Sequence, residues 1–438
     1  MDALTRNMPS VGDEAQAQPV DLHPLCCAAA TPAPASWETR LSHLLHAEHH
    51  FARKGSYIGV AYTMTAVAIG LNLLTPLYSI YRVKFAFSAL TLTLIFATYI
   101  VTIIPAMLIF GPLADAFGRR RILLISVLCA AFATVILLTA SGTPWLFAAR
   151  IVQGIAQGAI SGAASAALIE LGSDLKKTAL VIGMTVTGGI ALGPILSGVL
   201  AQYAPGPLTL CFIVYLILLV PALLVTLWMT EPLPPANRRA FRPHRPSLPT
   251  NGKQAFLIST AVAAFGFAAS SLFLSVIPSF LVALLHTSNI ALLTAPVGLF
   301  LAASPLIQLL LHNLSAKRAA LIGLVLEMIG LLGTLYTASI GSLPLLLVAA
   351  VIGGGGAGLA YLGSLSFINQ IIPKEQRADV FGTYYALNYL SLGVTSIVVG
   401  FLAAPLGLAI AVRWVSAAVV VLCLLTALAV LRLLPAQN

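Results

Sequence analysis

The sequence predicts an all-α polytopic membrane protein with twelve transmembrane helices in two six-helix pseudo-repeats. Hydrophobic residues make up 59% of its 438 residues and charged residues only 8%, whereas soluble domains carry about 25% charged residues. Apolar sequence runs from about residue 57 almost to the C-terminus, and one spanning helix needs about 20 apolar residues. These observations exclude a soluble protein, a disordered chain and a protein with a single membrane anchor.

Glycine, proline and charged residues divide the apolar sequence into twelve predicted spans. The spans of the first half are 57–79, 88–110, 122–140, 145–169, 178–201 and 208–229. The spans of the second half are 255–280, 289–311, 319–338, 342–369, 380–403 and 408–433. The expected domains are a disordered or loosely helical tail over 1–56, six-helix bundles over 57–229 and 255–434, a polar linker over 230–254 and a C-terminus over 435–438.

The basic residues predict the orientation of the chain in the membrane. When the N-terminus is placed inside, most of the 23 lysines and arginines fall on the cytoplasmic side, which is the side that basic loops favour. We therefore expect a multi-pass protein of the cell (inner) membrane with both termini in the cytoplasm.

The two halves share landmarks at a constant offset in residue number. The matching pairs are Gly154 and Gly353, Gly183 and Gly382, Arg119 and Arg318, and Tyr57 and Phe256. Duplicated bundles that flank a central site are a common plan of membrane transporters.

The loop after the second span reads GPLADAFGRRR over residues 111–121. One interpretation is a basic loop that only sets the topology. The string also closely resembles a signature of the major facilitator superfamily, and the resemblance extends over residues 57–434. The resemblance implies a conformational latch between the two halves, formed by Gly111, Asp115, Gly118 and Arg119.

The fourth span carries an arginine, Arg150, that a helix would align with Gln157 and place beside Gln153. A charge inside a span is costly and indicates function by default; the alternative is an arginine that reaches the outer membrane surface. The neighbouring face, with Gly154 and Gly158, predicts close helix packing. The R-x-x-Q-G pattern resembles a motif of the same superfamily that is implicated in proton coupling.

The fifth span resembles the antiporter motif of the superfamily's twelve-helix drug:proton exporters. Its matching residues are Gly189, Gly193, Pro194 and Gly198. The family ends this motif with two glycines, whereas Ser197 precedes Gly198 here. The alternative is generic helix flexibility, since glycine and proline are frequent in spanning helices. The resemblance implies a kinked helix along which the two halves can move, and it favours export over import.

The proton carrier is open at this point, because the first span offers Asn72 and Thr75 but no acid. Glu170 ends the fourth span and Glu327 lies deep in the ninth, while Asp379 fits a helix N-terminal charge. Glu327 is either a coupling residue or a protonated structural group that bonds a neighbouring helix.

Polar and aromatic residues of the spans expected to line the path form a predicted substrate cavity, which suits an amphiphilic or weakly cationic compound. They are Asn72, Tyr99, Gln153, Gln157, Ser271, Gln308, Tyr361, Tyr384, Tyr385, Asn388 and Tyr389.

We therefore expect a monomeric secondary transporter that works by alternating access and exports small hydrophobic or drug-like compounds against protons. The alternatives are a facilitator or symporter for a small metabolite, a non-transporting sensor and an intramembrane enzyme, for which no catalytic motif is present. The expected partners are a small-molecule substrate, protons and the lipid bilayer. We expect no cofactor, metal or nucleic acid.

Overall fold

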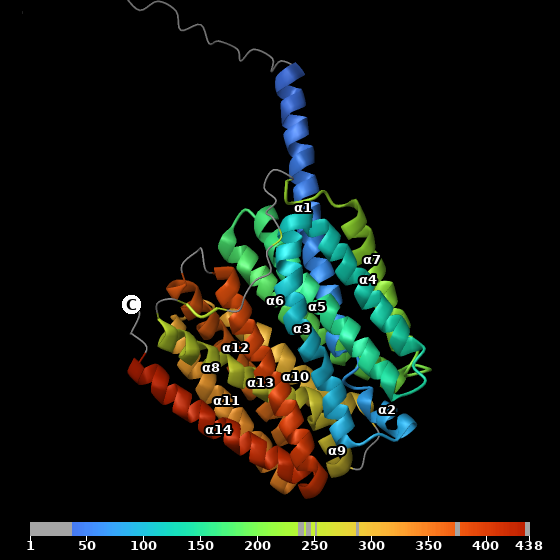
Figure 1. The fold of residues 1–438 in the computed structure, drawn as a ribbon, viewed down its shortest axis with the longest axis vertical. Coiled ribbons are helices and arrows are strands. Elements are labelled where there is room, and N and C mark those ends of the chain that lie inside the picture. Colours follow the sequence, from blue (N-terminus) through green and yellow to red (C-terminus); the bar gives the residue numbers. More distant parts are fainter. Residues whose placement is uncertain are drawn as a thin grey trace, which may run out of the picture. The chain divides into compact units, whose positions relative to one another are not determined.

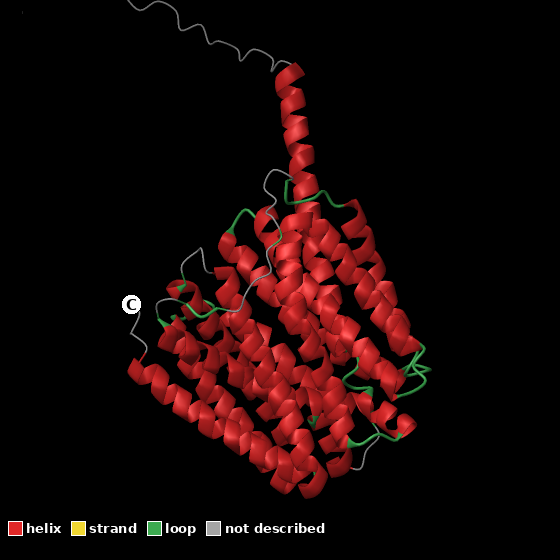
Figure 2. Cartoon of the chain, in the orientation of Figure 1, coloured by secondary structure: helices red, strands yellow, loops and turns green. Residues whose placement is uncertain are grey.

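The computed structural model describes residues 37–234, 241, 247–249, 252–285, 289–372 and 377–433. All regular secondary structure in these residues is helical (Figures 1 and 2). The chain divides into two compact units, Met1–Phe51 and Ala52–Asn438, and helices α2 to α14 belong to the second. The predicted tail before residue 37, parts of the linker 230–254 and the C-terminus 435–438 lie outside the described residues.

The helices follow one another in two sets of seven. The first set is α1 (Trp37–Asn72), α2 (Tyr78–Phe85), α3 (Ala89–Phe117), α4 (Arg119–Leu138), α5 (Thr143–Leu171), α6 (Leu175–Tyr203) and α7 (Leu210–Trp228). The second set is α8 (Lys253–Ser275), α9 (Ile277–Leu285), α10 (Ile290–Leu310), α11 (Ala316–Ile340), α12 (Leu343–Ile371), α13 (Arg377–Leu406) and α14 (Leu408–Leu433).

Eleven of the described helices are long and apolar enough to cross a membrane. They match the second to twelfth predicted spans, and the end of α1 supplies the first. Their outer faces expose large apolar side chains, such as Val421, Leu424 and Leu428 of α14, as a helix that faces lipid does. The predicted all-α polytopic fold is therefore confirmed.

Two predicted spans, 57–79 and 255–280, are each broken near one end. The first helix stops at Asn72, residues 73–77 form a turn, and α2 begins at Tyr78; α8 stops at Ser275 and α9 begins at Ile277. A proline accompanies each break (Pro76 and Pro278), and proline lacks the N–H group that continues a helix. Each break follows the first long helix of its half, so the two breaks are equivalent.

The packing of α5 and α12 shows the repeat in three dimensions. Both helices contain 29 residues. Gly154 of α5 lies against the Tyr99 carbonyl of α3, and Gly354 of α12 lies against Phe300 of α10. The packing equivalent of Gly154 is therefore Gly354, and the predicted match of Gly154 with Gly353 is wrong by a single position.

The two halves meet through two equivalent helix pairs, α3 with α13 and α6 with α10. We call the end of the bundle where α3 begins the Tyr81 end, and the end where α3 stops the Arg119 end. These helix pairs border the candidate site.

Candidate functional site

Arg150 of α5 is completely buried, with 0% of its surface exposed. Its Nη1 donates to the Leu71 carbonyl at 2.6 Å and to Oε1 of Gln153 at 3.0 Å. Its Nε and Nη2 donate to the Tyr78 hydroxyl at 2.9 and 2.6 Å. Because all these contacts are internal, Arg150 does not reach toward the membrane surface.

The break after Asn72 explains how the protein accommodates this charge. The last carbonyls of a helix have no partner within the helix and carry its negative dipole end. Leu71 and Gly70 lie in the last turn of α1; Leu71 accepts from Arg150, and Gly70 accepts from Nε2 of Gln153 at 3.1 Å. The guanidinium is thus held by uncharged oxygens and by a helix end.

Two tyrosine rings complete the surroundings of the guanidinium. Its carbon lies 5.4 Å from the ring centres of both Tyr78 and Tyr99, close enough for cation–π attraction. We call Arg150, Gln153, Tyr78, Tyr99 and the end of α1 the arginine site. Sequence reasoning missed Tyr78, although its position after Pro76 at the end of the first span was a possible signal.

A chain of aromatic residues leads from the arginine site into the second half. Tyr389 of α13 lies near Tyr99 and packs edge-on against Phe267 of α8, with ring centres 5.5 Å apart. The hydroxyls of Tyr361 and Tyr385 lie 3.3 Å apart, and Phe267 also packs against Tyr361 at 6.2 Å. The structure therefore brings together predicted cavity residues from both halves.

Several buried oxygens of the predicted cavity lack a hydrogen-bond partner among the described residues. They are the side-chain oxygens of Asn72, Gln157, Ser271 and Asn388. Such groups normally have a protein or water partner. Gln308, which was also predicted to line the cavity, donates to the Ser304 hydroxyl of its own helix at 3.1 Å.

The predicted latch residues form a charged cluster at the Arg119 end. Arg119 pairs with Asp115 at 2.5 Å and with Glu170 at 3.1 Å. Glu231 accepts from the backbone N–H groups of Arg119 and Arg120 at 2.7 and 3.2 Å. In the described chain these contacts join α3, α4, α5 and the segment that follows α7, all within the first half.

Glu231 had no place in the sequence-based prediction. Its signal was the acidic position directly after the sixth span, where it caps the N-terminus of α4 and meets the positive end of that helix dipole. Gly118, which precedes α4, has a φ of 103°, and an added Cβ would lie 2.5 Å from Glu231 Oε2. Gly118 is therefore required by its backbone conformation and by this close approach. Gly111 lies one turn before Asp115 in α3.

The two acidic coupling candidates lie away from the arginine site. Glu170 is on the same helix as Arg150 but near its other end, about 30 Å away, and belongs to the charged cluster. Glu327 is wholly buried in α11 of the second half. The side chain of Asp379 is outside the described residues.

The glycines of the predicted antiporter motif face two different partners. Gly189 and Gly193 lie against the backbone of α1, whereas Gly198 lies against Thr294 of α10 in the second half. The expectation of one smooth face between the halves is therefore wrong for Gly189 and Gly193, because they pack within the first half.

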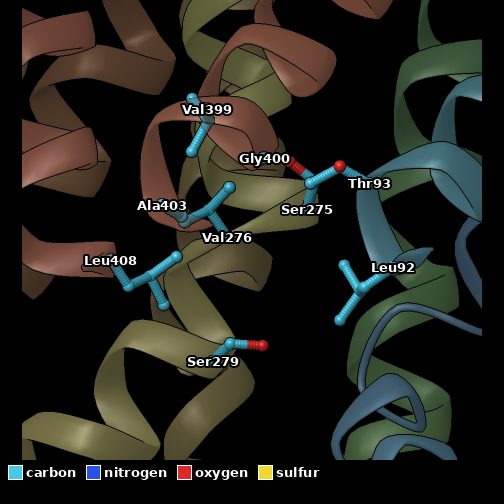
Figure 3. A pocket seen from close by; sticks show the side chains of 9 residues that line it. All are labelled: Leu92, Thr93, Ser275, Val276, Ser279, Val399, Gly400, Ala403 and Leu408. Carbon is cyan, nitrogen blue, oxygen red and sulfur yellow. The ribbon is translucent and has the colours of Figure 1, made fainter. Parts of the chain in front are cut away.

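The other helix pair between the halves has the same kind of contact. Gly400 of α13 lies against Thr93 of α3, and the Ser396 hydroxyl donates to the Thr93 carbonyl at 3.5 Å. Figure 3 shows a small pocket at this point, which Thr93 lines together with Ser275, Ser279 and Gly400. The two halves are thus in direct contact at the Tyr81 end.

Comparison with known proteins places this architecture in a family. The profile of the Major Facilitator Superfamily matches residues 58–312 and 261–438. An uncharacterised MFS-type transporter of Bacillus subtilis strain 168, YybF, is 29% identical over 169 residues, or 35% of this chain and 40% of that protein. The puromycin resistance protein pur8 of Streptomyces alboniger is 35% identical over 100 residues, or 22% of this chain and 20% of that protein.

The chain thus spans less than half the length of these curated relatives. Among solved structures, the human organic anion transporter MFSD10 (TETRAN) matches with a TM-score of 0.63 at 18% identity. The match covers 86% of this chain and 99% of that one. At this identity, the match shows the fold alone. With its family profile over nearly all of the bundle, the chain belongs to the Major Facilitator Superfamily of membrane transporters.

Proposed function

We propose that this transporter exports small amphiphilic or drug-like compounds in exchange for protons. It acts as a monomer in the cell's inner membrane, with both termini in the cytoplasm. The observation that carries the proposal is the arginine site, because a fully buried cation held by tyrosine, amide and carbonyl groups of the first half is costly to keep without function.

Contacts between the halves support alternating access. At the Tyr81 end, Gly198 and Gly400 bring α6 and α13 onto the opposite half, and Gln202 Oε1 accepts from the Ile290 N–H at 2.7 Å. At the Arg119 end, the described ion pairs of Arg119 stay within the first half. We interpret this conformation as closed at the Tyr81 end, which the basic loops place outside the cell.

The composition of the cavity supports an amphiphilic substrate. Free oxygens of Asn72, Gln157 and Asn388 can accept hydrogen bonds from a compound, and the tyrosine chain offers flat apolar surfaces. The partial similarity to a puromycin resistance protein supports the same substrate class. The resemblance of residues 189–198 to an antiporter motif supports export.

Transport by the full chain in proteoliposomes tests the proposal. The compounds are puromycin, the lipophilic cation ethidium and the organic anion fluorescein, each with and without an imposed pH gradient. We expect wild-type protein to move at least one of them faster with the gradient, and Arg150→Ala to move none. Transport at the same rate with and without the gradient would favour a facilitator. Transport of the compound in the same direction as the protons would favour a symporter.

A further inference from the structure

Glu327 of α11 is a buried acid that the arginine site does not use. Its side chain is 0% exposed, and both carboxyl oxygens lack a hydrogen-bond partner among the described residues. A structural glutamate that bonds a neighbouring helix would show such a partner, so the described contacts do not support that interpretation.

The position of Glu327 is set by close packing of α11 on α12. An added Cβ at Gly356 of α12 would collide with the backbone nitrogen of Glu327, and Gly330 similarly meets Gly353. Helices with small residues at the contact approach closely and pack firmly. Glu327 therefore lies at the centre of a tight helix pair, about midway along α11.

Few ionisable groups face Glu327 from the elements packed on α11, which are α12, α14 and α8. From α14, the buried Cys423 thiol lies near it. The ionisable residues of α12 and α8 are Tyr361, which pairs with Tyr385, and Lys253, the first residue of α8.

The charged residues at the ends of these helices are further away. Arg413 and Arg432 lie on opposite sides of Cys423 along α14, each about 14 Å from it along the helix axis. On α11 itself, Lys317 and Arg318 belong to the first turn. Glu327 therefore has a thiol beside it but no described basic group.

The equivalent crossing in the first half shows that an acid is not needed for packing. Ala156 of α5 corresponds to Gly356 of α12, just as Gly154 corresponds to Gly354. At that crossing the Ser126 hydroxyl of α4 donates to the Ala156 carbonyl of α5 at 2.7 Å. Among the described residues, the α4–α5 crossing thus contains a satisfied hydroxyl, whereas the equivalent helix pair α11–α12 buries an unsatisfied carboxyl.

From this geometry we infer that Glu327 binds and releases the proton exchanged during transport, which rests on the proposed proton coupling. In the conformation described here Glu327 holds the proton, because an ionised carboxylate without a partner is strongly disfavoured in an apolar interior. When the conformation changes, water reaches the carboxyl, its O–H bond breaks, the proton passes to water and a carboxylate remains. The arginine side chain cannot take this role, since arginine keeps its proton in proteins.

Distances between the halves test this inference without a substrate. In the full chain without native cysteines, spin labels at the exposed positions Tyr203 and Leu406 report on the Tyr81 end, and labels at Phe117 and Leu310 on the Arg119 end. Electron–electron resonance distances are recorded at acidic and alkaline pH. We expect the wild-type distances to shift between the two conditions, and Glu327→Gln to keep the acidic distances at both.

Two further variants separate proton binding from structure. Glu327→Asp keeps an acid and should keep a pH-dependent shift, whereas Ser126→Ala, which changes the equivalent crossing, should shift as wild type does. A wild-type protein whose distances ignore pH, or a Glu327→Gln protein that shifts as wild type does, would overturn the inference.

Modification by a carbodiimide, which attacks protonated carboxyl groups in apolar surroundings, gives a second readout. We expect mass spectrometry to find the adduct on Glu327 at acidic pH and much less of it at alkaline pH; equal labelling at both would contradict proton release. If the distances and the labelling of Glu327 depend on pH as expected but a pH gradient drives no export, the proposed function would be wrong while proton binding by Glu327 would stand.

Discussion

The arginine site and its counterpart in the second half have the same backbone packing but opposite chemistry. In the first half, Arg150 lies between Tyr78 and Tyr99. In the second half, the buried Ala350 occupies the position on α12 that matches Arg150 on α5. There Phe300, which corresponds to Tyr99, stacks on Phe273 with ring centres 4.3 Å apart and an interplanar angle of 18°.

This difference shows that the duplicated fold does not require a buried charge. The broken first helix occurs in both halves, at α1–α2 and at α8–α9. Among the described residues, an arginine binds the carbonyls that the break leaves free only in the first half, whereas the second half has an apolar stack there. The two bundles thus provide a common framework, and the asymmetric residues provide the function.

Arg150→Ala should have the largest effect on transport and so tests this asymmetry first. We expect export to be lost, because the variant removes the buried cation on which the proposed function rests, together with its four hydrogen bonds. The protein level in the membrane should stay normal. Arg150→Lys should not restore export, because an ammonium cannot reproduce the planar set of donors.

Ala350→Arg places an arginine in the second half, at the position that matches Arg150 in the first. The second half has the apolar Phe273–Phe300 stack where the first has the Tyr78 hydroxyl, so a new arginine would find no matching acceptor. We expect destabilisation of about 2.5–3.5 kcal/mol, the cost of a central arginine in a span, and a lower thermal midpoint in detergent. Unchanged stability would mean that the two halves are less different than the structure indicates.

Gly198→Leu and Gly400→Leu test the feature that the two halves share. Each glycine lies against a threonine of the opposite half, Thr294 and Thr93, and the two pairs occupy matching places in the repeat. A leucine at either position should keep the Tyr81 end open and slow export several-fold, as distances between spin labels at that end would show. The matched control is Gly188→Leu on α6, since an added Cβ there meets nothing within 4 Å.

The smallest expected effect concerns the N-termini of α4 and α11, which both lie at the Arg119 end. Glu231 caps α4, whereas Ser315 before α11 makes no side-chain capping bond. Glu231→Gln should lower the free energy of unfolding by about 1 kcal/mol, and Ser315→Ala should change it by less than about 0.5 kcal/mol. Thermal melting of the purified variants checks both, and equal shifts would remove the capping role of Glu231.

The sequence predicted the helices well because lipid imposes a strong and simple pattern on them. Long apolar runs and basic loops mark the spans regardless of tertiary contacts. The breaks at Asn72 and Ser275 were missed because the apolar sequence continues through them. The prolines next to them were the local signal.

The site was predicted in part. Arg150 and Gln153 stood out because charge and amide groups are rare inside spans. Their partners could not be predicted, because a backbone carbonyl such as that of Leu71 has no signature in the sequence. Gly189 and Gly193 face α1, whereas Gly198 faces α10. This difference depends on how α6 is rotated between these two neighbours, which the sequence does not reveal.

Proton flux caused by an exported compound tests the central claim most directly. Proteoliposomes containing a pH-sensitive dye receive puromycin, ethidium or fluorescein on one side, and the internal pH is followed for wild type and Arg150→Ala. The account predicts that at least one compound drives protons in the opposite direction through wild type and that none does so through Arg150→Ala. Compound movement without proton flux, or the same flux through both proteins, would contradict it.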